Sequence, residues 1–169
     1  MDISEFDALD EAAARALLLG CADVPRWAEQ VVAARPYADP AALLAHADEL
    51  AAGWSGAEVT RALADHPRIG ERHAGAGAAA DHSAAEQAGV DARDADLAAR
   101  LAAGNRAYEE RFDRIFLVRA AGRSAGEILE LLEQRLDHDP ATELAVTAGQ
   151  LREIAVLRLR GLVSGLVDA

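Results

Sequence analysis

Residues 124–163 read SAGEILELLEQRLDHDPATELAVTAGQLREIAVLRLRGLV, and this stretch decides the fold class. Ser124 and Glu127 have the spacing of a capping box, in which the two residues bond each other's backbone at the start of a helix. Pro140 stands where a second helix begins, since proline is favoured in the first helical turn. Apolar residues follow each start at spacings that keep them close to one face of a helix. They are Ile128, Leu131, Leu132, Leu136, Leu144, Leu151, Ile154, Leu157 and Val163.

The same signals extend outward over most of the chain, and no alternation typical of a strand persists over five residues. Helices are expected from Ser4 to Leu19, from Asp23 and Pro25 onward, from Asp39 and Pro40 to about Ala51, from Ser55 to about Ala64, from Ser83 to about Gly89, and from Asp94 through Phe112 to Ile115. The prediction is an all-α fold. It consists of one domain over residues 1–169, a compact bundle of about eight helices with a long active-site loop between residues 65 and 82.

Composition limits the function classes. Hydrophobic residues make up 51% of the 169 residues but aromatic residues only 4%, and the abundant alanine favours helices over strands. The net charge of −12 argues against general binding of nucleic acid. Cys21 is the sole cysteine, so a reducing cytoplasm is expected. No apolar run is long enough to span a membrane, and no secretory signal is recognised at the N-terminus.

Residues 65–87, DHPRIGERHAGAGAAADHSAAEQ, begin with the one long stretch that lacks helical periodicity. Long loops inside compact domains are usually functional or disordered, and the well-capped surroundings favour function. His66 precedes Pro67, which turns the chain away from helical geometry. Two interpretations stay open for His66: a residue that bonds the last carbonyls of a helix, or an imidazole that exchanges a proton with a ligand.

Two further groups each have a structural and a functional interpretation. Ser83 and Glu86 fit a capping box, but they also place Gln87 near a helix N-terminus that favours anions. Arg158 lies close to the apolar stripe of the last helix. There it either covers the edge of the core or supplies a cation to an anionic ligand.

Other chemistries are disfavoured by spacing. His66, His73 and His82 are seven and nine residues apart, so no pair has the four-residue spacing that presents two metal ligands on one helix face. Asp81-His82-Ser83 contains the residue types of a hydrolase triad, but triad members meet in space rather than in sequence. The fragment at Gly75 and Gly77 lacks the strand and third glycine of a dinucleotide-binding turn.

Taken together, several segments resemble one family. They are FDALDEAAARALLLGCADVPRWAEQVVAARPY at 6–37, HPRIGE at 66–71, SAAEQAGV at 83–90, NRAYEERFDRIFLVRAAGRSAGEIL at 105–129 and REIAVLRLRGLV at 152–163. In this order and spacing they are similar to the 2-oxo-4-hydroxy-4-carboxy-5-ureidoimidazoline (OHCU) decarboxylases of urate breakdown. Each motif alone is weak, but their common register covers nearly the whole chain.

The resemblance implies an all-α enzyme, usually a homodimer, that needs neither metal nor organic cofactor. The implied reaction is decarboxylation of OHCU, a small-molecule substrate, to (S)-allantoin and CO2, the third step from urate. It implies His66 as the catalytic proton donor, with substrate-binding residues at Pro67, Ser83, Ala84, Ala85, Glu86, Gln87, Phe116, Leu117, Val118, Arg119, Ala120 and Arg158. Many family members carry a small residue at the position of Arg119, so the orientation of this side chain decides the charge of the pocket.

Glu86 is assigned a second, catalytic role as a hypothesis: it bonds the 4-hydroxyl and, with His66, places the scissile carboxylate out of the ring plane. Two alternatives to this function remain. One is a non-enzymatic helical interaction module, which predicts a substantial exposed apolar surface. The other is a lyase that acts on a related ureido ring compound.

Overall fold

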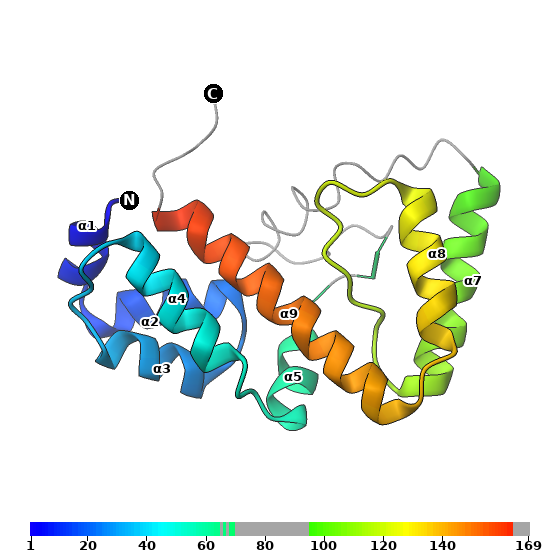
Figure 1. Cartoon of the computed structure of the whole chain (residues 1–169), viewed down its shortest axis with the longest axis horizontal. Coiled ribbons are helices and arrows are strands. Elements are labelled where there is room, and N and C mark those ends of the chain that lie inside the picture. Colours follow the sequence, from blue (N-terminus) through cyan, green and yellow to red (C-terminus); the bar gives the residue numbers. More distant parts are fainter. Residues whose placement is uncertain (65, 67, 70–94, 164–169) are drawn as a thin grey trace. The chain divides into compact units, whose positions relative to one another are not determined.

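The computed structural model describes residues 1–64, 66, 68, 69 and 95–163 (Figure 1). These residues contain eight helices and no strand, which confirms the all-α prediction. The helices are α1 (Ile3–Ala8), α2 (Glu11–Cys21), α3 (Pro25–Ala33), α4 (Pro40–Ala51), α5 (Gly56–Leu63), α7 (Ala95–Phe112), α8 (Ala125–Leu136) and α9 (Pro140–Val163). The predicted loop at 65–82 falls almost wholly outside the described residues, and the predicted helix at Ser83 does so entirely. None of the described helices is both long and apolar enough to cross a membrane.

The helix starts predicted at Asp39, Ser55 and Ser124 are confirmed, whereas α1 is capped by Asp2 rather than started at Ser4, and α3 has no side-chain cap. At α8, the Ser124 N–H donates to the Glu127 carboxylate at 2.7 Å, and the Glu127 N–H donates to the Ser124 hydroxyl at 3.3 Å. The Asp39 carboxylate likewise accepts the Ala42 N–H at 2.7 Å at the start of α4. These bonds satisfy backbone donors that have no partner inside the helix.

The single helix predicted from Ser4 to Leu19 is wrong, because the chain breaks between α1 and α2. The backbone is extended at Leu9 and Asp10, and the Asp10 carboxylate caps α2 by accepting a backbone N–H at 2.8 Å. Arg35 closes the end of α1 by donating to the carbonyls of Phe6 at 3.1 Å and Leu9 at 2.7 Å. A cation is favoured at this end of a helix, but Arg35 reaches it only through the tertiary fold.

The continuation of the long helix to Ile115 is also wrong, because α7 ends at Phe112. Asp113 has a φ of +52°, the left-handed conformation that commonly ends a helix and that aspartate tolerates better than most residues. Its N–H still donates to the Glu109 carbonyl at 2.9 Å. The chain then leaves the helix and buries Phe116 in the core.

The chain forms two compact units. The first comprises residues 1–62 and the chain from Leu151 onward, and the second comprises residues 63–150. In the first unit α3 packs against both α2 and α4 (Figure 1). Its fully buried large side chains are Phe6, Leu18, Val24, Trp27, Val31, Leu43, Leu151 and Leu159. The Trp27 indole N–H donates to the Ala47 carbonyl at 2.8 Å, so its polar atom is satisfied inside the core.

In the second unit, α7 and α8 run parallel to each other (Figure 1). Arg100 near the start of α7 pairs with Glu133, and Arg111 near its end donates to the backbone of His138, just beyond α8. Since residue numbers increase together along both helices, the connection over residues 113–124 must return along the length of α7. This returning connection contains the predicted substrate-binding residues 116–120.

A charged capping box in the first unit makes stability depend on pH. Arg26 donates to both Glu58 carboxylate oxygens at 2.8 and 2.9 Å, and the Ser55 N–H donates to the same carboxylate. The bond from Arg26 outweighs burial, and with the bonds from Ser55 it lowers the pKa of Glu58 from 4.5 to about 2. Because the folded pKa lies below the unfolded one, the ionised carboxylate stabilises the fold above pH 4.5. This contribution disappears as the pH falls to about 2.

We therefore expect Glu58→Gln to lower the free energy of unfolding by about 1 kcal/mol at neutral pH, the usual magnitude for loss of a cap. The difference from wild type should shrink as the pH falls from 4.5 to about 2. Urea denaturation at several pH values, monitored by far-UV circular dichroism, measures the free energy of unfolding of both proteins. A difference that stays constant over this range would contradict the assignment.

Candidate active site

His66 lies just beyond the end of α5, in the second unit. Its backbone N–H donates to the Leu63 carbonyl at 3.1 Å, which continues the last turn of the helix by one bond. The residue is half-buried and its Nε2 atom is shielded from solvent. The structure therefore holds this imidazole at the end of a helix, with its Nε2 atom shielded from water.

Two residues of α7, one helical turn apart, hold the chain that follows His66. The Asn105 side-chain amide donates to the Ile69 carbonyl at 3.2 Å, and Asn105 is only 5% exposed. Glu109 receives two bonds from Arg68, at 2.5 and 2.9 Å, and these bonds lower the pKa of the Glu109 carboxyl. Together the two contacts hold Arg68 and Ile69 against α7.

The predicted segment Phe116–Ala120 lies in the same apolar cluster as Ile69 of that motif. Phe116, Val118 and Ala120 are buried there together with side chains of α7 and α8. The structure thus brings the motif of His66 and the predicted substrate-binding segment into one core of the second unit. They are separated by about fifty residues in sequence, and local periodicity contains no signal of this meeting.

Polar contacts from three directions hold the backbone of this segment. Arg135 of α8 donates to the Leu117 carbonyl at 2.6 Å. Gln150 of α9 accepts the Arg119 N–H at 2.9 Å, and the Arg123 side chain donates to the Arg119 carbonyl. The carbonyl and amide groups of the segment are therefore held in a set direction although the segment is neither helix nor strand.

Arg119 is the residue whose side-chain orientation the sequence left open. Its backbone serves the contacts just described, and its side chain is half-buried with the Nε atom shielded from solvent. The guanidinium is therefore not fully extended into solvent.

Arg158 belongs to the first unit and is buried in α9, with 5% of its surface exposed. One of its guanidinium nitrogens donates to the Cys21 carbonyl at 3.2 Å. Glu143, Thr147, Leu151 and Ile154 precede it on the buried face of the same helix, at intervals of four, four, three and four. Arg158 thus continues the buried stripe of α9, where it donates to the backbone of the first unit.

The remaining predicted site residues, Pro67 and Ser83 to Gln87 with Glu86 among them, lie outside the described residues. In the described part of the chain, no three His, Cys, Asp or Glu side chains are grouped in a way that would hold a metal ion.

Sequence reasoning missed the polar residues that support the site: Asn105, Arg135, Glu143, Thr147 and Gln150. The sequence of the last helix did contain a signal for two of these buried polar residues. Glu143 and Thr147 share the buried face with Leu151, where a purely structural stripe would be apolar. A charged residue at such a position indicates a buried partner.

The family model described as OHCU decarboxylase matches residues 7–160, nearly the whole chain. The chain belongs to the OHCU decarboxylase family. Among relatives of this family, a 2-oxo-4-hydroxy-4-carboxy-5-ureidoimidazoline decarboxylase of Amia calva is 35% identical over 100 residues, which cover 58% of this chain and 57% of that protein. The uric acid degradation bifunctional protein TTL of Arabidopsis thaliana is 36% identical over 64 residues, 38% of this chain and 20% of that protein. The alignment thus spans little more than half of the Amia calva relative and a fifth of the plant protein.

Solved structures of the family support the fold. An OHCU decarboxylase crystallised in the presence of (S)-allantoin has a TM-score of 0.71 and 24% identity, with 85% of this chain and 94% of that chain covered. An (S)-allantoin synthase has a TM-score of 0.69 and 18% identity, with 96% and 54% covered. At these identities the likeness establishes a shared all-α fold.

Proposed function

We propose that this protein decarboxylates OHCU to (S)-allantoin and CO2, the third step of urate degradation. The observation that carries the proposal is the match of the OHCU decarboxylase family model over residues 7–160. The placement of the His66 motif and the Phe116–Ala120 segment in one core supports it, because a decarboxylase of this kind needs a proton donor and a rigid surface that orients the ring.

The enzyme must control which face of the ring receives the proton. It need not lower the activation barrier greatly, since OHCU also decays unaided. When the bond to the carboxylate breaks, its electron pair moves into the ring toward the adjacent imine nitrogen, which takes up a proton, and CO2 departs. The 4-hydroxyl then gives up its proton to become a carbonyl, and the ring carbon that carries the ureido group receives a proton from one face. A single enantiomer results only if the ring is held in one orientation.

His66 is the proposed general acid that delivers the proton to the ring carbon. Neutral imidazole and imidazolium interconvert near neutral pH, so a histidine is suited to this transfer. Glu86 is proposed to bond the 4-hydroxyl, and its negative charge near the substrate carboxylate favours departure of neutral CO2. The role of His66 rests on its position in the family motif, and the role of Glu86 is a hypothesis drawn from the chemistry of a carboxylate in the pocket-lining segment.

Binding is proposed to come from amides and from one cation. Gln87 offers both a donor and an acceptor to the amide edges of the substrate. Val118 is buried, and its backbone N–H and carbonyl have no hydrogen-bond partner among the described residues, so this amide is suited to the ring or ureido group. Arg158 is proposed to hold an electron-rich group of the substrate. Pro67, Ser83, Ala84 and Ala85 complete the proposed contacts.

The proposal extends to assembly and location. We expect a homodimer in the cytoplasm that works without metal or organic cofactor. These expectations come from the family resemblance, the lone cysteine and the acidic composition.

We expect the purified protein to convert OHCU, made in place from urate by upstream enzymes, into one-handed allantoin. Circular dichroism follows this directly, since (S)-allantoin is chiral and the unaided decay gives a racemate. Fast build-up of an (S) signal supports the function. Racemic product at the enzyme-free rate contradicts it, and consumption of another ureido compound in preference to OHCU would transfer the assignment to a related lyase.

The interaction-module alternative lacks a specific observation in its favour. Among the described residues, only Met1 and Leu157 are exposed large hydrophobic residues. Two isolated side chains do not form the broad apolar patch that such a module would present.

A further inference from the structure

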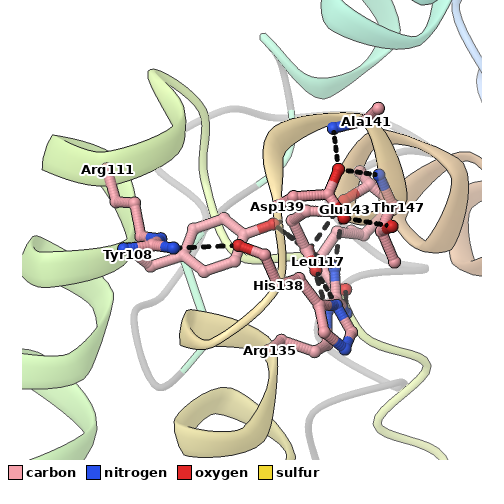
Figure 2. Close-up of polar contacts among 10 residues, drawn as sticks. Tyr108, Arg111, Leu117, Arg135, His138, Asp139, Ala141, Glu143 and Thr147 are labelled. Carbon is pink, nitrogen blue, oxygen red and sulfur yellow. Dashed lines mark hydrogen bonds and ion pairs between the residues drawn. The ribbon is translucent and has the colours of Figure 1, made fainter.

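A buried polar cluster in the second unit contacts the backbone of Leu117 in the Phe116–Ala120 segment (Figure 2). Arg135, Glu143, Tyr108 and Thr147 are 4% exposed or less. The Arg135 Nε donates to a Glu143 oxygen at 2.9 Å, and its Nη2 donates to the same oxygen, to Thr147 at 3.0 Å and to the Tyr108 hydroxyl at 3.3 Å. The remaining nitrogen, Nη1, donates to the Leu117 carbonyl at 2.6 Å.

Arg135 therefore divides its donors between the cluster and the segment. Two nitrogens engage the cluster while the third reaches the backbone of Leu117, and the guanidinium also lies over the Phe116 ring at 4.7 Å from its centroid. Contacting the cluster and the Leu117 backbone at the same time requires a planar group with donors on several sides. A lysine ammonium is a single point of charge and cannot form both sets of contacts at once.

The charge on Glu143 keeps the guanidinium in place. Burial alone would raise the pKa of Glu143, but hydrogen bonds from Arg135 and Tyr108 outweigh it and lower this pKa, so the carboxylate is ionised at neutral pH. Burial and the bond to Glu143 raise the pKa of Tyr108 to about 12, so the phenol stays a donor. His138 contacts the second Glu143 oxygen at 2.8 Å. Because both oxygens are engaged, the cluster has one well-defined arrangement.

Stability alone does not account for this cluster, because a buried ion pair is often no more stabilising than an apolar pair of the same size. Its distinctive consequence is geometric. The Leu117 carbonyl is fixed from α8, and the next-but-one residue, Arg119, is fixed by Gln150 of α9 and by Arg123. The peptide groups of Val118 lie between these fixed points.

We propose that Arg135 is a positioning residue of the decarboxylase site, which sets the direction of the Phe116–Ala120 backbone toward substrate through the Leu117 carbonyl. The inference rests on the proposed function, and it assigns Arg135 no contact with substrate. Glu143, Tyr108 and Thr147 act through Arg135 by holding its guanidinium.

The test compares Arg135→Lys with Arg152→Lys, the same substitution elsewhere in the chain. Arg152 forms a two-bond pair with Asp48 at 2.6 and 2.8 Å, and both residues belong to the first unit. For each protein we would measure kcat, KM and the enantiomeric excess of allantoin, at a temperature where circular dichroism shows the chain fully folded.

Arg135→Lys is expected to raise KM about 10-fold or more and to lower the enantiomeric excess, since misplaced binding groups hold the ring less firmly. Arg152→Lys should leave both within about twofold. A structural role alone would lower the melting temperature of Arg135→Lys without changing KM or enantiomeric excess in the molecules that remain folded. Wild-type values in both quantities would therefore overturn the proposal.

If Arg135→Lys does not fold, a second variant tests the same proposal. Thr147→Val removes one acceptor of the guanidinium while preserving volume and the ion pair, and it should raise KM about threefold or lower the enantiomeric excess. Unchanged values in folded Thr147→Val would overturn the proposal. Wild-type protein assayed in parallel separates the two hypotheses: an inactive wild type overturns both the function and this role, whereas an active wild type matched by the variants overturns the role alone.

Discussion

Replacing His66 by alanine is expected to lower kcat for OHCU decarboxylation by a factor of about 10²–10⁴, the usual contribution of a general acid. The enantiomeric excess of the allantoin should also fall, because protonation by solvent does not select a face. Circular dichroism during OHCU turnover measures both quantities. The substitution should leave the helical content unchanged, since the backbone N–H of His66, which the substitution keeps, makes the bond to α5.

His46→Ala is the matched control. His46 is also half-buried, but it lies in α4 of the first unit, with its ring 6.0 Å from that of Tyr37. It should retain wild-type kcat and product handedness. A folded His66→Ala protein with wild-type rate and handedness would remove His66 from the mechanism, and the structural interpretation as a helix-end residue would then stand.

Glu143→Ala is expected to produce the largest loss of stability, about 3–5 kcal/mol in the free energy of unfolding. It leaves the buried guanidinium of Arg135 without its counter-charge, and removal of one partner of a buried pair has this magnitude. It also takes an acceptor from Tyr108. In a chain of this length each kcal/mol shifts the melting temperature by roughly 2–4 °C, so thermal denaturation resolves the effect easily.

Two comparisons sharpen this prediction. Asp48→Ala breaks the partly exposed pair with Arg152 and should cost less than about 1 kcal/mol, because water screens that pair. Replacing both Arg135 and Glu143 by methionine should restore most of the lost stability, since no charge is then left buried alone. A loss below about 1 kcal/mol in Glu143→Ala would show that Arg135 finds another partner.

The two predictions separate stability from catalysis. Loss of Glu143 is expected to act first on folding, whereas loss of His66 is expected to act on the chemical step alone. The double methionine variant is informative for both. If it is stable yet has a raised KM, the polar cluster orients the site rather than stabilising the fold.

Local sequence was sufficient for most helix starts and failed at two helix ends. Ser55, Ser124 and Asp39 each bond a backbone group three residues away, so the spacing in the sequence already contains the contact. The break after α1 depends in part on Arg35, which arrives from 26 and 29 residues away in sequence. The end of α7 at Phe112 depends on the burial of the chain that follows it.

The sequence by itself determined the all-α class and, through the family motifs, the identity of the candidate site residues. It did so because capping and helical period are interactions within a few residues. Only the tertiary structure decided how the described site residues are held: Arg135 bonds Leu117 over 18 positions, and Asn105 bonds Ile69 over 36. Such contacts depend on α7 and α8 running parallel, with a long returning connection between them. No local spacing encodes that arrangement, because the direction of one helix relative to another is set by the packing of their buried faces.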